Sequence, residues 1–115
     1  METTKEISKK IRSRLKNQFP NCKFSVTSDY SKIKVALMAG NFNPFLKDEK
    51  EISLNHYYLE KEAITDEAKV VLKTALSIAN EFNYDNSDLM ADYNDVGFYF
   101  GLSIGKWDKH YTQTA

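Results

Sequence analysis

The stretch Val-Gly-Phe-Tyr-Phe-Gly-Leu-Ser-Ile-Gly at residues 96–105 alternates without interruption between large apolar residues and small or polar ones. The apolar members are Val96, Phe98, Phe100, Leu102 and Ile104. Because successive side chains of a β-strand point to opposite faces of a sheet, this period of two predicts a strand with one buried face. We expect it to be the central or best-buried strand.

The other face of this strand would carry three of the four glycines of the chain. Its members are Gly97, Tyr99, Gly101, Ser103 and Gly105. Glycine inside a strand is typical of a bend, or of a backbone that another group approaches closely. We favour tight packing of a helix or a coiled sheet on this side, and the alternative is a groove for a ligand or partner.

Two segments have the periodicity of amphipathic helices. The first runs from Thr4 to Phe19, with apolar residues four positions apart among many basic ones, and Pro20 ends it. The second follows Thr65, a suitable N-cap, and continues to Phe82 with two acidic residues in its first turn.

The remaining strands are expected between these helices. Alternation through Phe24 and Val26, and again through Ile33 and Val35, predicts an antiparallel hairpin, and residues 52–59 predict a third strand. The expected fold class is therefore a two-layer α+β domain of order α-β-β-β-α-β, with the helices packed on one face of an antiparallel or mixed sheet. At 115 residues, we expect a single domain, residues 1–115.

Composition points to a reducing compartment. No apolar run is long enough to span a membrane, and the single Cys22 cannot form an internal disulfide. We therefore expect a cytoplasmic protein without membrane contact. Cys22 opens the apolar alternation that follows Pro20, which predicts a buried structural thiol.

A search for catalytic or cofactor motifs finds none. His56 and His110 lack the spacing of metal ligands, no serine lies in a Gly-x-Ser-x-Gly elbow, and no glycine-rich nucleotide loop occurs. The acidic residues near Asp92 do not fit a calcium-binding EF-hand loop. The sequence predicts no enzyme activity, no cofactor and no metal, and a structural role for Trp107 at the end of the last strand.

Charge is distributed unevenly, although the net charge is zero. Residues 1–47 carry ten basic and three acidic groups, whereas residues 48–95 carry twelve acidic and four basic groups. This asymmetry offers two candidate surfaces. The basic surface lies on one flank of the first helix and consists of Lys5, Lys9, Arg12 and Lys16. The acidic surface consists of Tyr84, Asp85, Asp88, Asp92, Tyr93 and Asp95.

Three motifs of the C-terminal third resemble a known family: Asn83 to Asp88, Asp92 to Gly97, and Ile104 to Lys109. They are similar to a large polyvalent protein-associated domain, the twenty-ninth of that series, and the first helix leading into Phe24 also fits. The sequence departs from the family pattern at Asn94, where an aromatic residue is expected, and at His110, where proline is expected. The resemblance implies a setting in phages, plasmids and conjugative elements, and it carries over no catalytic residues.

The function expected from these observations is a non-enzymatic, protein-binding accessory domain of a mobile genetic element. Its partner would be a protein of the host or of the element, with a counter-defence inhibitor of a host nucleic-acid-handling protein as one form. The acidic surface would then contact the partner, because a row of carboxylates can imitate phosphates. The alternative is a nucleic-acid-binding module that acts through the basic first helix.

Overall fold

The computed structural model describes residues 3–47, 50–83, 98–106 and 108–114. Its helices and strands are, in chain order, α1 (Thr4–Gln18), β1 (Lys23–Ser28), β2 (Lys32–Gly40), β3 (Ile52–Leu54), the 3-10 helix η1 (His56–Lys61), α2 (Asp66–Glu81), β4 (Tyr99–Ile104) and β5 (Thr112–Gln113). This order agrees with the expected α+β class.

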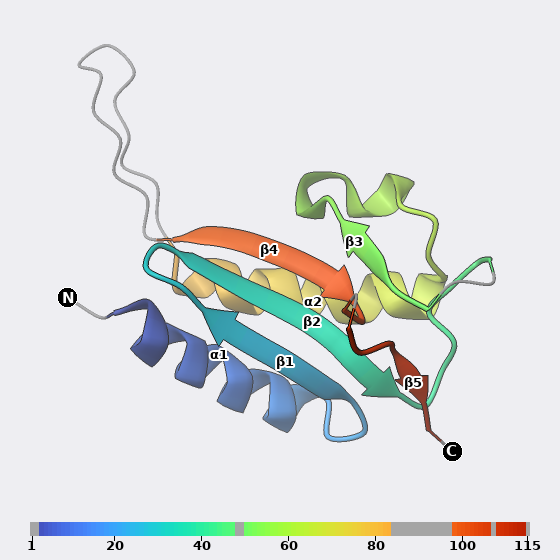
Figure 1. The fold of residues 1–115 in the computed structure, drawn as a ribbon, viewed down its shortest axis with the longest axis horizontal. Coiled ribbons are helices and arrows are strands. Elements are labelled where there is room, and N and C mark those ends of the chain that lie inside the picture. Colours follow the sequence, from blue (N-terminus) through green and yellow to red (C-terminus); the bar gives the residue numbers. More distant parts are fainter. Residues whose placement is uncertain (1–2, 48–49, 84–97, 107, 115) are drawn as a thin grey trace, which may run out of the picture.

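The strands form one mixed sheet in the order β1-β2-β4-β3, and β5 pairs with the end of β2 (Figure 1). The β1–β2 hairpin is antiparallel, β4 lies parallel to β2, and β3 closes the other edge antiparallel to β4. The strand predicted within residues 96–105 is therefore an interior strand, as expected. The sequence left open whether the sheet is antiparallel or mixed, and the parallel β2–β4 pair makes it mixed.

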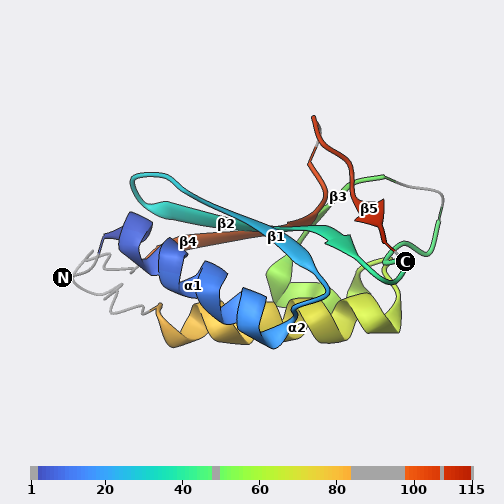
Figure 2. The same cartoon turned by 90° about the horizontal axis from the view of Figure 1, so that it is seen from below.

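Both α-helices pack on the same face of the sheet, as predicted (Figure 2). Each helix begins at a threonine: the Thr3 side chain accepts a hydrogen bond from the backbone N–H of Glu6, and the Thr65 side chain accepts one from Ala68. Such caps satisfy N–H groups that have no partner within the helix. The sequence therefore sets where α1 and α2 start.

The core lies between the helices and one face of the sheet. Ile11 and Leu15 of α1 and Leu72 of α2 are fully buried there. They meet the inward side chains of the two interior strands, which are Ile33, Val35, Leu37, Leu102 and Ile104. We call this the core face of the sheet; burial of its apolar side chains is the main favourable contribution to folding.

Two expectations about the strands were wrong. The third strand ends at Leu54 and gives way to η1, whereas the sequence predicted extended chain to residue 59. The reason is local, because the Asn55 side chain accepts a hydrogen bond from the backbone N–H of Tyr57 and so starts a turn. The short strand β5 was not predicted, since two polar residues carry no periodicity.

None of the helices that the structure describes is long and apolar enough to cross a membrane.

Candidate functional site

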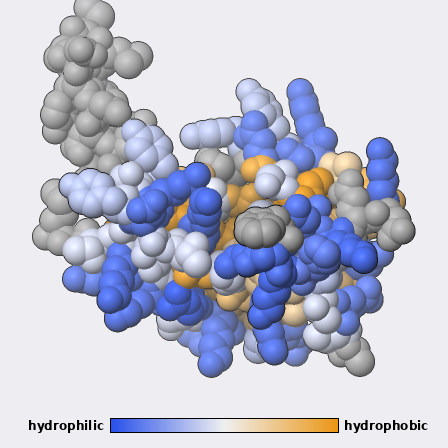
Figure 3. All heavy atoms as spheres, viewed as in Figure 1, coloured by the Kyte–Doolittle hydropathy of each residue, from blue (hydrophilic) through white to orange (hydrophobic). Residues whose placement is uncertain are grey.

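The side of the sheet that faces away from the helices is the candidate site. We call it the open face, and its members are Ser25, Thr27, Lys32, Lys34, Ala36, Ser53, Tyr99, Gly101 and Ser103. Within the described ranges no helix covers it, because α1 and α2 both pack on the core face (Figure 2). In the space-filling view of this side, hydrophilic residues dominate and hydrophobic atoms show only between them (Figure 3).

Strand register arranges the open face in rows across the sheet. Ser25 pairs with Ala36, Ala36 with Ser103, and Ser103 with Ser53, so one row of small residues crosses four strands. Neighbouring strands lie about 4.8 Å apart, so this row extends over roughly 14 Å. This row forms the floor of the open face, and the Lys106 side chain lies over it between β4 and Ser25.

The next rows along the strands carry the charge. Lys34 pairs with Gly101 in β4 and Thr27 in β1, and Lys32 pairs with Tyr99. Both lysine side chains are exposed. Because Lys32 and Lys34 alternate with the buried Ile33 and Val35, the burial of the core face holds the two lysines on the open face.

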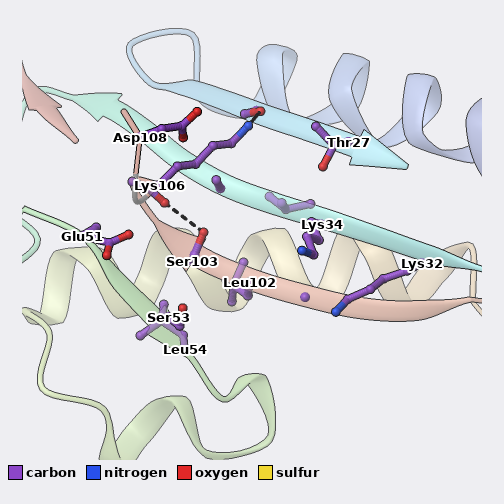
Figure 4. A pocket seen from close by; sticks show the side chains of 15 residues that line it. Thr27, Lys32, Lys34, Glu51, Ser53, Leu54, Leu102, Ser103, Lys106 and Asp108 are labelled. Carbon is purple, nitrogen blue, oxygen red and sulfur yellow. Dashed lines mark hydrogen bonds between the residues drawn. The ribbon is translucent and has the colours of Figure 1, made fainter. Parts of the chain in front are cut away.

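Together these rows line a groove of about 580 Å³. Figure 4 shows Lys32 and Lys34 at one end of it and Glu51 and Asp108 at the other. Lys106, which follows β4, also lines the groove. The groove is therefore basic along most of its length and acidic at one end.

Lys106 is held across the sheet. Its Nζ donates a hydrogen bond of 2.7 Å to the Ser25 hydroxyl in β1, so its side chain passes over the intervening strand β2 (Figure 4). Beneath this side chain Ala36 is only 3% exposed. Within the described part of the chain, no carboxylate forms an ion pair with Lys32, Lys34 or Lys106. Among the described residues, the groove thus carries three lysines and two carboxylates that form no ion pair with them.

The glycines of β4 and its exit have two different roles. At Gly105 the backbone φ is +71°, and an added Cβ would lie 2.9 Å from both Lys50 O and Tyr111 N, so two backbone segments pack against it. At Gly101 an added Cβ would meet only lysine side chains, with Lys34 Cγ nearest at 3.2 Å. Close packing therefore explains why a glycine stands at position 105. The groups that approach it are the backbone of Lys50 and Tyr111, whereas the sequence favoured a helix or a coiled sheet. Gly97 lies outside the described residues.

The basic flank predicted on α1 is present. Lys5, Lys9, Arg12 and Lys16 are all exposed. Arg12 also supports the fold, because its Nη2 donates a hydrogen bond to the Val26 carbonyl of the edge strand β1. The structure thus places this flank beside β1, next to the open face but not part of the groove.

One further basic residue of α1 is neutralised. Arg14 Nη1 lies 2.6 Å from Glu81 Oε2 of α2, and the hydrogen bond from Arg14 lowers the pKa of the Glu81 carboxyl. Both side chains are about half exposed, so the pair contributes little to stability. It links α1 to α2 at the surface, on the side of the sheet away from the groove.

The predicted acidic surface lies outside the part of the chain that the structure describes. Tyr84, Asp85, Asp88, Asp92, Tyr93 and Asp95 lie outside the described residues, as does Trp107. The predictions for them stay predictions.

Cys22 and Tyr111 form a small, partly buried cluster away from the groove. The thiol is half-buried, where the sequence predicted a buried one, and burial raises its pKa. Burial, with smaller effects of Cys22 and Glu67, raises the pKa of Tyr111 to about 12, and its hydroxyl donates a hydrogen bond of 2.7 Å to the Phe42 carbonyl. Both groups stay protonated at neutral pH, so the cluster supports the fold and offers no reactive thiolate.

Within the described ranges, no three His, Cys, Asp or Glu side chains come together as a metal site would require.

The fold and the site define the class of protein: a small α+β domain with a mixed sheet whose helices cover one face and whose other face is open and basic. Residues 2–84 match the family model described as Large polyvalent protein associated domain 29, and the chain belongs to this family. No curated protein and no solved structure gives a significant match.

The matched region differs from the motifs that suggested the family. It contains α1, the β1–β2 hairpin and α2, together with Lys32 and Lys34. The motifs at residues 92–97 and 104–109 lie beyond it. The first helix is thus within the matched part, whereas the motif ending at Lys109 is not.

Sequence reasoning did not identify the open-face lysines as a site. The alternation of Lys32 and Lys34 with apolar residues showed that they face away from the core. The missing information was the partner strand, because only the parallel pairing with β4 places them beside Gly101 and Tyr99.

Proposed function

We propose that this domain is a non-enzymatic nucleic-acid-binding module that acts through the open face of its sheet. The observation that carries the proposal is the groove of about 580 Å³ whose lysines form no ion pair with a carboxylate of the described residues. Phosphates are the common partner of such exposed basic groups, and lysine and hydroxyl groups supply many protein contacts to them.

The composition of the groove supports a phosphate ligand. Ser25, Thr27 and Ser103 bring hydroxyl groups beside the lysines, and hydroxyl groups and lysines together supply many protein contacts to phosphate oxygens. Placing the site on the sheet revises the expectation that α1 alone would bind nucleic acid. The α1 flank then acts as a neighbouring basic surface that steers the ligand.

The family supplies the setting of the proposal. Domains of this description are associated with large polyvalent proteins. We infer that the module is an accessory part of a phage, plasmid or conjugative element and handles nucleic acid there, without chemistry of its own.

Fluorescence anisotropy of a labelled oligonucleotide is the direct test. The wild type should bind at low salt with a steep salt dependence. The Lys32→Glu, Lys34→Glu double variant should lose at least about tenfold in affinity, and the slope of log K against log salt should fall by about 1.4 to 1.8, because two phosphate contacts are lost. Both side chains are exposed, so the variant should still unfold cooperatively.

The matched control is the Lys5→Glu, Lys9→Glu double variant of α1, which changes the net charge equally. It should retain most of the affinity. An equal loss in the two variants, or a larger loss in the α1 variant, contradicts the assignment to the sheet. Absence of binding by the wild type at low salt contradicts the function altogether.

The acidic surface keeps its separate prediction of a protein partner. It would be tested by recovering host proteins on the wild type and on an Asp88→Lys, Asp92→Lys, Asp95→Lys variant. Identical recovery by the two proteins would remove any reason to assign a partner to this segment.

A further inference from the structure

Two exposed aromatic rings stand at the basic end of the groove. Tyr99 pairs with Lys32 across the parallel β2–β4 ladder and shares the open face with it. Tyr30 lies in the β1–β2 turn, two residues before Lys32. Tyr99 is 51% exposed and Tyr30 is 96% exposed, so both side chains reach the solvent near Lys32.

The backbone holds this end of the groove in place. The Tyr99 N–H donates a hydrogen bond of 2.8 Å to the carbonyl of Ser31 in the turn, and the Asp29 N–H donates one of 2.7 Å to Lys32 O. The turn is thus tied to β4 as well as to its own hairpin. These main-chain hydrogen bonds fix the backbone at Tyr99 and Lys32.

The two ends of the groove differ in what they can bind. Glu51 and Asp108 would repel phosphates at one end, whereas Lys32 and Lys34 attract them at the other (Figure 4). The lysine end, which lies nearest to Tyr99, therefore attracts a polyanion more strongly than the other end does. At this position Gly101 has no side chain of its own, and the aliphatic parts of Lys34 and Lys32 lie beside it, 3.2 Å and 3.5 Å from where a Cβ would be.

Resting on the proposed function, we propose that the open face binds single-stranded nucleic acid, with Tyr99 stacking on a base, Tyr30 offering a second ring, and Lys32 and Lys34 contacting the adjacent phosphates. Paired bases hide their faces within the duplex stack, so a protein ring can stack only on an unpaired base. A basic groove combined with exposed aromatic rings is the arrangement that binds single strands without reading their sequence.

The test compares three ligands on the same protein: an oligothymidylate of about 15 nucleotides, a duplex of the same length, and heparin, a polyanion without bases. The wild type should prefer the single strand to the duplex. Tyr99→Ala should weaken single-strand binding by roughly 5- to 150-fold, the loss expected for one stacked base, without changing the salt slope. Its binding to heparin should be unchanged.

Two control variants separate stacking from other effects. Tyr99→Phe keeps the ring and should keep the affinity for the single strand. Tyr57→Ala removes an exposed ring in η1, outside the open face, and should have no effect.

The outcomes also separate this inference from the function on which it rests. Equal or tighter binding of the duplex, or unchanged single-strand binding by Tyr99→Ala, overturns the single-strand inference. The proposed function still holds in that case if the Lys32→Glu, Lys34→Glu variant loses affinity. If the Lys32→Glu, Lys34→Glu variant loses no more affinity than the Lys5→Glu, Lys9→Glu control, both the proposed function on the sheet and the single-strand inference are overturned. A Tyr99→Ala protein that loses heparin binding as well contradicts stacking, because heparin has no bases to stack.

Discussion

The two faces of the same strands differ in the burial and the polarity of their side chains. On the core face, Ile33 and Ile104 are completely buried beneath the helices. On the open face, the adjacent Lys32 and Lys34 are exposed, and Tyr99 leaves half of its surface in contact with solvent. Alternate residues of one strand thus have two different environments: one set is buried and stabilises the domain, and the other lies at the surface.

The energetic reason is the difference between burying a carbon atom and leaving it in water. Complete burial of a Leu or Ile side chain contributes about 1.5 to 3 kcal/mol, and removing it leaves a cavity that costs more. An exposed lysine contributes almost nothing to stability wherever it stands. The open face can therefore carry charged side chains with little effect on the free energy of unfolding.

The largest expected effect tests this contrast within one strand. Ile104→Ala on the core face should lower the free energy of unfolding by about 2 to 5 kcal/mol, because the side chain is fully buried. Tyr99→Ala, five residues earlier on the open face, should lower it by less than about 1 kcal/mol. Urea denaturation followed by circular dichroism measures both.

If the two variants lost comparable amounts of unfolding free energy, the core face would not be the main source of stability in the sheet. Any loss of ligand binding in Tyr99→Ala would then have to be attributed to altered folding.

A smaller effect sharpens the comparison at the two glycines. Gly105→Ala should cost about 1 to 2 kcal/mol for the left-handed backbone alone, and more because the new Cβ would meet two backbone atoms at 2.9 Å. Gly101→Ala on the open face should change stability by no more than about 0.5 kcal/mol, since only flexible lysine side chains must move. Thermal denaturation of the two variants decides the matter.

If Gly101→Ala were the more destabilising of the two, the floor of the groove would be a packed surface and not an accessible one. In that case the open face could not admit a ligand as proposed.

Much of the fold could be read from local patterns. The helices were predicted because Ile7, Ile11 and Leu15 recur at helical spacing and because Thr65 is a good cap. The β1–β2 hairpin and β4 were predicted from their period of two. Residues 55–59 were misread because their aromatic content favours a strand, whereas the hydrogen bond from Tyr57 to the Asn55 side chain favours a turn.

The candidate site was predicted only in part. Basic residues of α1 were expected at the surface, and they are exposed there. The glycine-rich side of β4 was noted as a place of close approach, and Gly105 bears this out. The groove itself was not predicted, because its residues come from distant parts of the chain. Ser25 and Lys106, for example, are 81 positions apart.

By itself the sequence determined which residues turn inward, since burial of apolar side chains and backbone hydrogen bonding act over a few residues and leave a period in the chain. Only the tertiary structure decided that β4 runs parallel to β2 and lies between β2 and β3. Strand order depends on long-range contacts whose loop-closure entropy and packing energies are not written in any local segment. That choice brought Lys32 beside Tyr99 and left their face of the sheet open.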